Sequence, residues 1–196
     1  MDSSDETREK CQQAFIELLR EKGYNGVRMV EVARRAGVSR PTLYRYFSSR
    51  EEMFRALADH IFELFYDQAE HYLEDFDDSM SLTMNKLAAN VAMKHLSWVQ
   101  ALADSGADDI FVSQLRKYFS RMVGSMLRHK NKTLVSQERL EAVTAMMAGA
   151  CYYPLKHWLR SGMKQTPAEM AGVLSHTFNG RLLDLLVAED SAPQSN

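Results

Sequence analysis

The side chains best suited to a chemical task lie together in the short run from Arg40 to Tyr46. The guanidinium groups of Arg40 and Arg45 have the length and the paired donors to bind O6 and N7 of a guanine. Phenol groups suit phosphate oxygens, and a proline ring or a threonine methyl group can contact the methyl group of a thymine. The sequence therefore predicts a surface that reads bases and holds phosphates in double-stranded DNA, made by Arg40, Pro41, Thr42, Tyr44, Arg45 and Tyr46.

Two short helices joined by a turn are predicted to position these side chains. The first helix carries an apolar stripe made by Val32, Ala33 and Ala36. Gly37 then supplies the left-handed conformation that ends this helix. Val38, the apolar residue of the turn, is expected to fill the crevice between the two helices.

The second short helix has its own start signal and its own core face. Ser39 is expected to accept a hydrogen bond from the backbone amide of Thr42. Pro41 falls in the first turn, where amides lack partners within the helix. Leu43 and Phe47 are four residues apart and should face the core. This pattern predicts a helix-turn-helix.

Positive charge is concentrated in the same part of the chain. The whole sequence has a formal net charge of −2, but from Lys22 to Arg50 seven basic residues stand against Glu31 alone, a local charge of +6. A basic patch of this kind is what neutralisation of DNA phosphates requires. The alternative is that these arginines only solvate helix surfaces.

The run Val32–Phe47, VARRAGVSRPTLYRYF, resembles the DNA-binding segment of the tetracycline-repressor (TetR) family. The resemblance extends to the pair Gly23–Tyr24 and to the linker Ser48–Glu52, and the segment Trp158–Leu174 is similar to the family's closing helix pair. It implies a bacterial, ligand-responsive transcriptional regulator. Such a protein binds a palindromic operator as a homodimer, usually as a repressor that a small-molecule effector releases.

One departure from the family concerns the phosphate contacts. Where the family commonly has a threonine at the start of the second helix, this chain has Arg28, which could reach a phosphate only as a point charge. Tyr44, Tyr46 and Arg50 are also expected to hold phosphates. The candidate DNA-binding residues are therefore Arg28, Ser39, Arg40, Pro41, Thr42, Tyr44, Arg45, Tyr46 and Arg50.

Composition predicts an all-α fold. Only nine glycines and four prolines are spread over 196 residues, and no run of alternating β-branched residues is present. We expect a three-helix DNA-binding domain at 1–49, a helical ligand-binding and dimerisation domain at 50–189, and a disordered tail at 190–196. Besides the helix-turn-helix, helices are predicted at 5–22, 50–73, 79–103, 108–130, 136–161 and 167–188, and the helix 50–73 links the two domains.

The sequence offers no sign of a membrane or metal protein. The first ten residues are too polar for a signal peptide, and no apolar stretch is long enough to span a membrane. We therefore expect a cytoplasmic protein with no membrane partner. Cys11 and Cys151 are expected to be buried structural thiols. The histidines form no close cluster, so neither a metal nor a cofactor is predicted.

The last two predicted helices are the candidate dimer interface. Both carry wide apolar stripes, and small residues such as Gly149 and Gly172 would let helices approach closely. In the TetR family the equivalent pair forms a four-helix bundle with its symmetry mate. A purely intramolecular core is the alternative, and Pro154 should kink the first helix. The candidates are Leu140, Val143, Met147, Cys151, Leu155, Trp158, Val173, Phe178, Leu182 and Leu185.

An effector pocket is expected among aromatic and methionine side chains of the second domain. Such side chains can line an apolar cavity for a small apolar or amphipathic effector, although a plain core uses the same residue types. His95, close to Trp98, is the polar candidate. The predicted lining is Phe62, Phe65, Tyr66, Met93, His95, Trp98, Phe119, Met122, Met126 and Tyr152.

Two other functions compete with a ligand-controlled regulator. The first is a helical DNA-binding regulator that a protein partner controls or that has no effector. The second is a small helical enzyme. The sequence has no glycine-rich phosphate loop, no nucleophile elbow, no HExxH motif and no cysteine pair, so we expect no catalytic activity.

Overall fold

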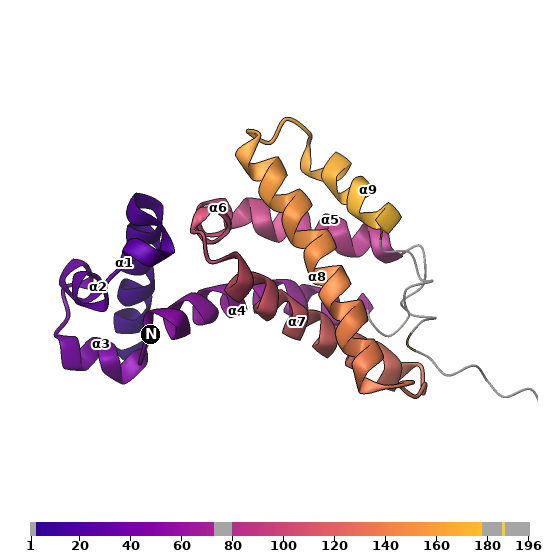
Figure 1. Ribbon diagram of the computed structural model, residues 1–196, viewed down its shortest axis with the longest axis horizontal. Coiled ribbons are helices and arrows are strands. Elements are labelled where there is room, and N and C mark those ends of the chain that lie inside the picture. The colour runs from indigo at the N-terminus through magenta and orange to yellow at the C-terminus, as the bar shows by residue number, and fades with distance from the viewer. Residues whose placement is uncertain (1–2, 73–79, 178–185, 187–196) are drawn as a thin grey trace, which may run out of the picture. The chain divides into compact units, whose positions relative to one another are not determined.

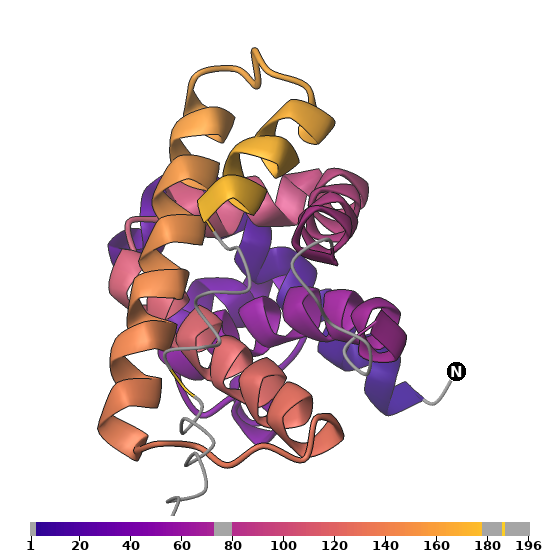
Figure 2. The same cartoon turned by 90° about the vertical axis from the view of Figure 1, so that its right-hand side faces the viewer.

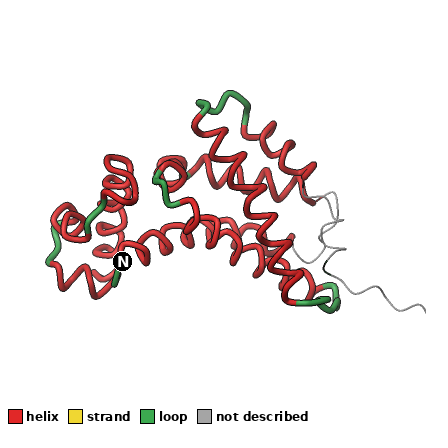
Figure 3. Tube along the Cα trace, in the orientation of Figure 1, coloured by secondary structure: helices red, strands yellow, loops and turns green. Residues whose placement is uncertain are grey.

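The computed structural model describes residues 3–72, 80–177 and 186, and within these ranges it contains helices and no strand. Short loops join the described helices (Figure 3). The all-α prediction is confirmed. In chain order the helices are α1 (Ser3–Gly26), α2 (Met29–Ala36), α3 (Arg40–Tyr46), α4 (Arg50–Ala69), the 3-10 helix η1 (Glu70–Tyr72), α5 (Met80–Lys94), α6 (Leu96–Asp104), α7 (Asp108–His129), α8 (Gln137–Arg160) and α9 (Pro167–Thr177) (Figure 1).

Helices α1, α2 and α3 form the predicted three-helix group (Figure 1). Their shared core contains Cys11, Phe15, Leu43 and Phe47, each at most 1% exposed. The helix predicted at 5–22 extends to Gly26 with a break at Gly23, whose φ of 67° and ψ of 171° are not helical. This break turns the chain toward α2.

One helix boundary predicted from the sequence is wrong. A single helix was expected at 79–103, but His95, with φ −114° and ψ 32°, separates α5 from α6. The amide of His95 still donates to the carbonyl of Val91, while its own carbonyl accepts from the amides of Trp98 and Val99. Neither glycine nor proline marks this break, and the apolar pattern continues across it, so nothing in the sequence indicates that the helix ends here.

The described residues form two compact units. Of the described residues, 3–64 and 91–114 form one unit, and 65–72, 80–90, 115–177 and 186 form the other. The helix α4 therefore belongs to both units. Helix α6 joins the first because it packs on α1, where the amide of Tyr24 donates to the carbonyl of Ser105 at 2.6 Å.

The second unit is built around buried aromatic and aliphatic side chains. The Tyr118 ring makes edge contacts with Phe65 and Tyr66, at centroid distances of 5.6 and 6.0 Å. Helices α8 and α9 lie side by side (Figure 2). Thr166 and Glu169 form a reciprocal capping box at the start of α9, with bonds of 2.7 and 3.2 Å.

The helix predicted at 136–161 is confirmed as α8. Helix α8 continues through Pro154 from Gln137 to Arg160. Of the helix predicted at 167–188, the structure shows Pro167–Thr177 as helix, and the remainder except Leu186, like the tail at 190–196, lies outside the described residues.

Candidate nucleic-acid interface

The turn between α2 and α3 has the geometry that its residues predict. Gly37 adopts φ 68° and ψ 29°, and its amide donates to the carbonyls of Ala33 and Arg34. The Oγ atom of Ser39 accepts a hydrogen bond from the amide of Thr42 at 3.2 Å and lies 2.7 Å from the Thr42 hydroxyl. The predicted cap of the second short helix is confirmed.

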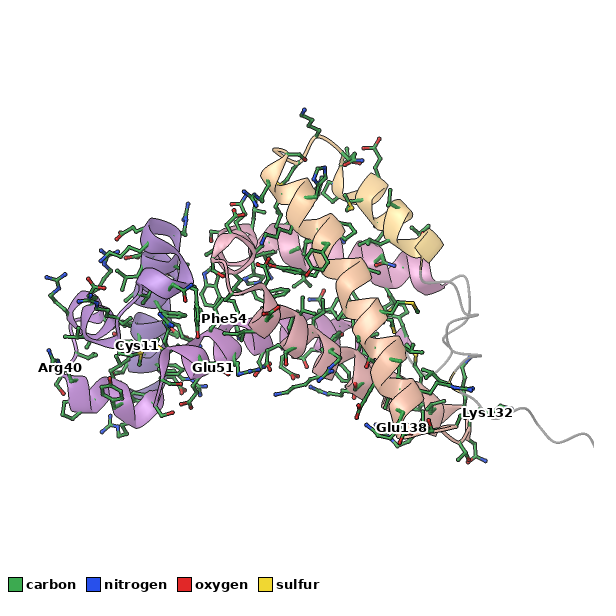
Figure 4. The ribbon with its side chains drawn as sticks, viewed as in Figure 1. Cys11, Arg40, Glu51, Phe54, Lys132 and Glu138 are labelled. Carbon is green, nitrogen blue, oxygen red and sulfur yellow. The ribbon has the colours of Figure 1, made fainter. Side chains whose placement is uncertain are left out.

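Helix α3 has one anchored face and one open face. Leu43 is fully buried and Phe47, directly after the helix, is 1% exposed. Tyr44 is 50% exposed. Arg40 stands at the outer edge of this three-helix group, whereas Cys11 lies inside it (Figure 4). The open face also carries Pro41 and Arg45, and it is exposed enough to enter the major groove of DNA.

Some charges of the basic segment are used inside the protein. Lys22 pairs with Glu31 at 2.6 Å, and Arg35 pairs with Glu21. The hydrogen bond from Lys22 is the main reason why the pKa of Glu31 lies below its ordinary value.

Other arginines of this segment remain available to DNA. Within the described residues, no carboxylate lies within ion-pair distance of Arg28, Arg34, Arg40 or Arg45. The positive charge that can act on DNA is therefore smaller than the +6 counted in the sequence, and it is carried by α2, α3 and the residue that precedes α2.

Arg50 has an internal role that the sequence did not reveal. Its Nη1 atom donates to the carbonyls of Tyr24, Asn25 and Val27 at 2.9, 3.1 and 3.4 Å. The guanidinium carbon lies 4.1 Å from the centre of the Tyr24 ring. Arg50 thus fastens the start of α4 to the end of α1. Phe54, which is also on α4, packs its ring edge-on against the Tyr24 ring of α1.

Tyr46 is the centre of a small polar network beside α3. Its hydroxyl lies 3.2 Å from the Ser4 hydroxyl and accepts a hydrogen bond from Nη2 of Arg45 at 3.1 Å. The hydrogen bonds with Ser4 and then with Arg45 hold the pKa of Tyr46 below its ordinary value. The network brings the first turn of α1 next to the end of α3, a proximity that no sequence motif indicated.

The residues predicted to line an effector pocket are divided between the two units. Phe62, Met93, His95 and Trp98 belong to the first unit, and Phe65, Tyr66, Phe119, Met122, Met126 and Tyr152 belong to the second. In the first, Phe62 packs against Phe111 and Trp98 against His60, both at 5.5 Å between ring centres, while Met93 is 38% exposed. In the second, Tyr152 is fully buried.

The surroundings of His95, the polar candidate of the predicted pocket, disfavour its charged form. Burial, followed by the charges of Lys94 and His60, lowers the pKa of His95. A groove of about 1100 Å³ in the first unit includes Trp98 in its lining, but its other walls carry charged side chains such as Asp5, Arg8 and Glu63. This groove does not have the apolar lining expected of the predicted pocket.

The candidate dimer residues also fall into distinct classes. Val143 and Trp158 are 5% and 1% exposed and therefore belong to the core of their own chain, whereas Val173 is 53% exposed. Leu140, Met147, Cys151 and Leu155 are half-buried, and Phe178, Leu182 and Leu185 lie outside the described residues. Burial raises the pKa of Cys151 to about 12.

Two exposed apolar residues on α8 were missing from the predicted interface. Met146 is 52% exposed and Tyr153 is 58% exposed. They are seven residues apart, so both lie on one face of the helix.

Along the described part of the chain, no helix is long and apolar enough to cross a membrane, and no three potential metal-ligating side chains lie together.

Comparison with known proteins identifies both parts of the chain. Residues 13–57 match the family model described as "Bacterial regulatory proteins, tetR family". Residues 90–180 match the model described as "Transcriptional regulator C-terminal region".

A segment of 53 residues is 43% identical to the HTH-type transcriptional activator FasR of Mycolicibacterium smegmatis. It represents 27% of this chain and 24% of FasR, so the similarity spans about a quarter of that relative.

Solved structures share the fold over nearly the whole chain. A TetR-family transcriptional regulator from Mesorhizobium loti is 18% identical with a TM-score of 0.58, and the match covers 96% of this chain and 100% of that chain. The transcriptional regulator FadR from Bacillus subtilis, solved in complex with stearoyl-CoA, is 12% identical with a TM-score of 0.58, covering 85% and 95% of the two chains. With a capped helix-turn-helix in place and both family models matched, this chain belongs to the TetR family, whose members are transcriptional regulators and not enzymes.

Proposed function

We propose that the chain is a homodimeric regulator that binds a palindromic operator through α3 of each protomer. The observation that carries this proposal is the anchoring of α3 by Leu43 and by the Ser39 cap, which leaves Arg40 and Arg45 on its open face. A single helix of this length makes too few contacts for selective binding, so two copies are needed. A chromosomal operator would place the protein in the cytoplasm.

Within this interface we assign direct base contacts to Arg40 and Arg45. Pro41 and Thr42 are proposed to contact thymine methyl groups, and Tyr44, Tyr46 and Arg28 to hold phosphates. Arg50 remains a candidate phosphate contact only through atoms other than the Nη1 that binds the carbonyls of Tyr24 and Asn25.

The proposed dimer interface uses α8 and α9. Its support is the exposure of Met146, Tyr153 and Val173, since large exposed apolar side chains that share a helix face are common at protein interfaces. The half-buried Leu140, Met147, Cys151 and Leu155 would border them.

A small apolar or amphipathic molecule is the proposed effector, and repression is the proposed mode of control. The support for the effector is the fold shared with FadR, which was solved with stearoyl-CoA, together with the aromatic and methionine side chains of the second unit. FasR, similar in the DNA-binding segment, is named an activator, so activation is the second candidate. Control by a protein partner is the alternative to a small molecule.

Selection of binding sites from random double-stranded DNA, with sequencing of the bound fraction, tests the proposal. A palindrome with half-sites about one helical turn apart, roughly 34–36 Å, is expected. Recovery of no preferred sequence by the full-length protein would contradict operator binding. A reporter with the recovered palindrome across its promoter then separates repression from activation by the direction of the change.

A further inference from the structure

Gln114 is a buried polar residue that links two helices distant in sequence. It lies on α7 and is 3% exposed. Its Oε1 atom accepts a hydrogen bond from Nη1 of Arg55 at 2.6 Å, and its Nε2 atom donates to Oδ1 of Asp59 at 2.6 Å. Both ends of one amide are therefore fixed by α4, from residues one helical turn apart.

The α4 residues that Gln114 holds lie on the same half of α4 as a residue that contacts α1. Arg55 also donates to Glu51 at 2.7 and 2.9 Å. Glu51 and Phe54, labelled in Figure 4, lie on the same half of α4, and the Phe54 ring contacts Tyr24 of α1. Gln114 therefore binds the half of α4 that also contacts α1 through Phe54.

Gln114 lies at the point of α7 where the first compact unit ends. It is the last residue of α7 in the first compact unit, and the helix continues without a break through Leu115 to His129 in the second. The bonds of Gln114 to Arg55 and Asp59 therefore lie directly before the point where α7 passes from one unit to the other.

We propose that Gln114 is a positioning residue through which α7 and the DNA-binding helices influence each other. The proposal rests on the proposed function and specifies a route of its regulation. Coupling between two sites is reciprocal, so if α7 affects DNA binding, then binding of DNA must affect α7. The route can consequently be tested without knowledge of the effector.

The test uses full-length variants that change the donor and acceptor roles at constant size. Gln114→Glu keeps an acceptor for Arg55 but loses the donor to Asp59 and places two carboxylates together. Asp59→Asn combined with Gln114→Glu supplies a new amide donor opposite the new carboxylate. Gln13→Glu is the matched control, because Gln13 is exposed on α1 and donates to Glu17.

Two quantities are measured with the operator recovered for the wild type. The first is the ratio of affinities for operator and random DNA, which should fall about tenfold in Gln114→Glu and recover to within about threefold in the double variant. The second is the change in hydrogen exchange of amides 115–122 on operator binding, which Gln114→Glu should abolish and the double variant should restore. Gln13→Glu should behave as the wild type in both.

The outcomes separate this inference from the proposed function. If the wild type selects no operator, the proposed function fails and the inference fails with it. If an operator is found, but Gln114→Glu keeps both the affinity ratio and the exchange response, only the role of Gln114 is refuted. A Gln114→Glu loss that the double variant does not restore also counts against it, since the bonds themselves would then not be the cause.

Discussion

The two compact units differ in how their residues acquire distinct roles. In the first, directional polar contacts assign a role to individual side chains: Ser39 caps α3, Arg50 binds the end of α1, and Gln114 joins α7 to α4. In the second, apolar side chains of similar type become core, as Tyr152 does, or exposed surface, as Tyr153 does. Polar roles in the first unit follow from hydrogen bonds between particular atoms, whereas apolar roles in the second depend on what lies opposite each side chain.

The strongest test of this contrast is truncation of a residue that anchors the first unit. Leu43→Ala should lower the free energy of unfolding by about 2–5 kcal/mol, because the side chain is fully buried and leaves a cavity. Tyr44→Ala, next to it and half exposed, should change that free energy by less than about 0.5 kcal/mol. Denaturant unfolding of both variants measures the difference. Similar losses for the two would contradict the assignment of the two faces of α3.

Substitution on the exposed face of α8 tests the second unit. Tyr153→Asp should weaken self-association by about 2 kcal/mol or more if this side chain is central to the interface. Sedimentation velocity over a concentration series measures the shift toward monomer. Arg20→Glu, an exposed change on α1, is the control and should leave the association unchanged. An unaltered dimer in the Tyr153 variant would place the interface elsewhere.

Two arginines of the first unit should separate base reading from phosphate binding. Arg45→Ala should reduce affinity for the operator by about 1–3 kcal/mol and have little effect on random DNA. Arg28→Ala should weaken both and lower the salt slope of binding by about one. Fluorescence anisotropy over a range of salt concentrations provides these numbers. Equal losses of Arg45→Ala on both DNAs would refute its base-reading role.

A matched pair of helix caps gives the smallest expected effect and compares the units directly. Ser39 caps α3 and Thr166 caps α9, each by accepting a backbone amide at 3.2 Å. Alanine at either position should cost about 0.5–2 kcal/mol of stability. Only Ser39→Ala should also weaken operator binding when both variants are measured well below their melting temperatures. A comparable loss of DNA affinity in Thr166→Ala would show that the two units are not distinct in this respect.

These contrasts explain what could be predicted from the sequence. Gly37, Ser39, Leu43 and Phe47 were assigned correctly because a cap, a left-handed glycine and a four-residue spacing are local signals. The α5–α6 break at His95 was missed, since its cause lies in backbone geometry that no particular residue type requires.

Long-range contacts were beyond the reach of such signals. The bonds of Gln114 to Arg55 and Asp59 join residues 59 and 55 positions apart. On α8 the sequence could not distinguish buried Val143 from exposed Met146, because both occupy apolar positions and only the neighbouring helices decide which is covered.

The raised pKa of both cysteine thiols has a practical consequence for spectroscopy. Cys11 is fully buried and Cys151 is half-buried, and burial raises the pKa of both thiols, that of Cys151 to about 12, so little of either is ionised near neutral pH. The ionised thiol is the form that reacts with thiol-reactive dyes, so the two native cysteines should be labelled only slowly. A single cysteine introduced at an exposed position of α1 such as Gln13 could then carry a label on each protomer. In the proposed dimer, the distance between the two labels would measure the separation of the DNA-binding helices in the free protein and on DNA.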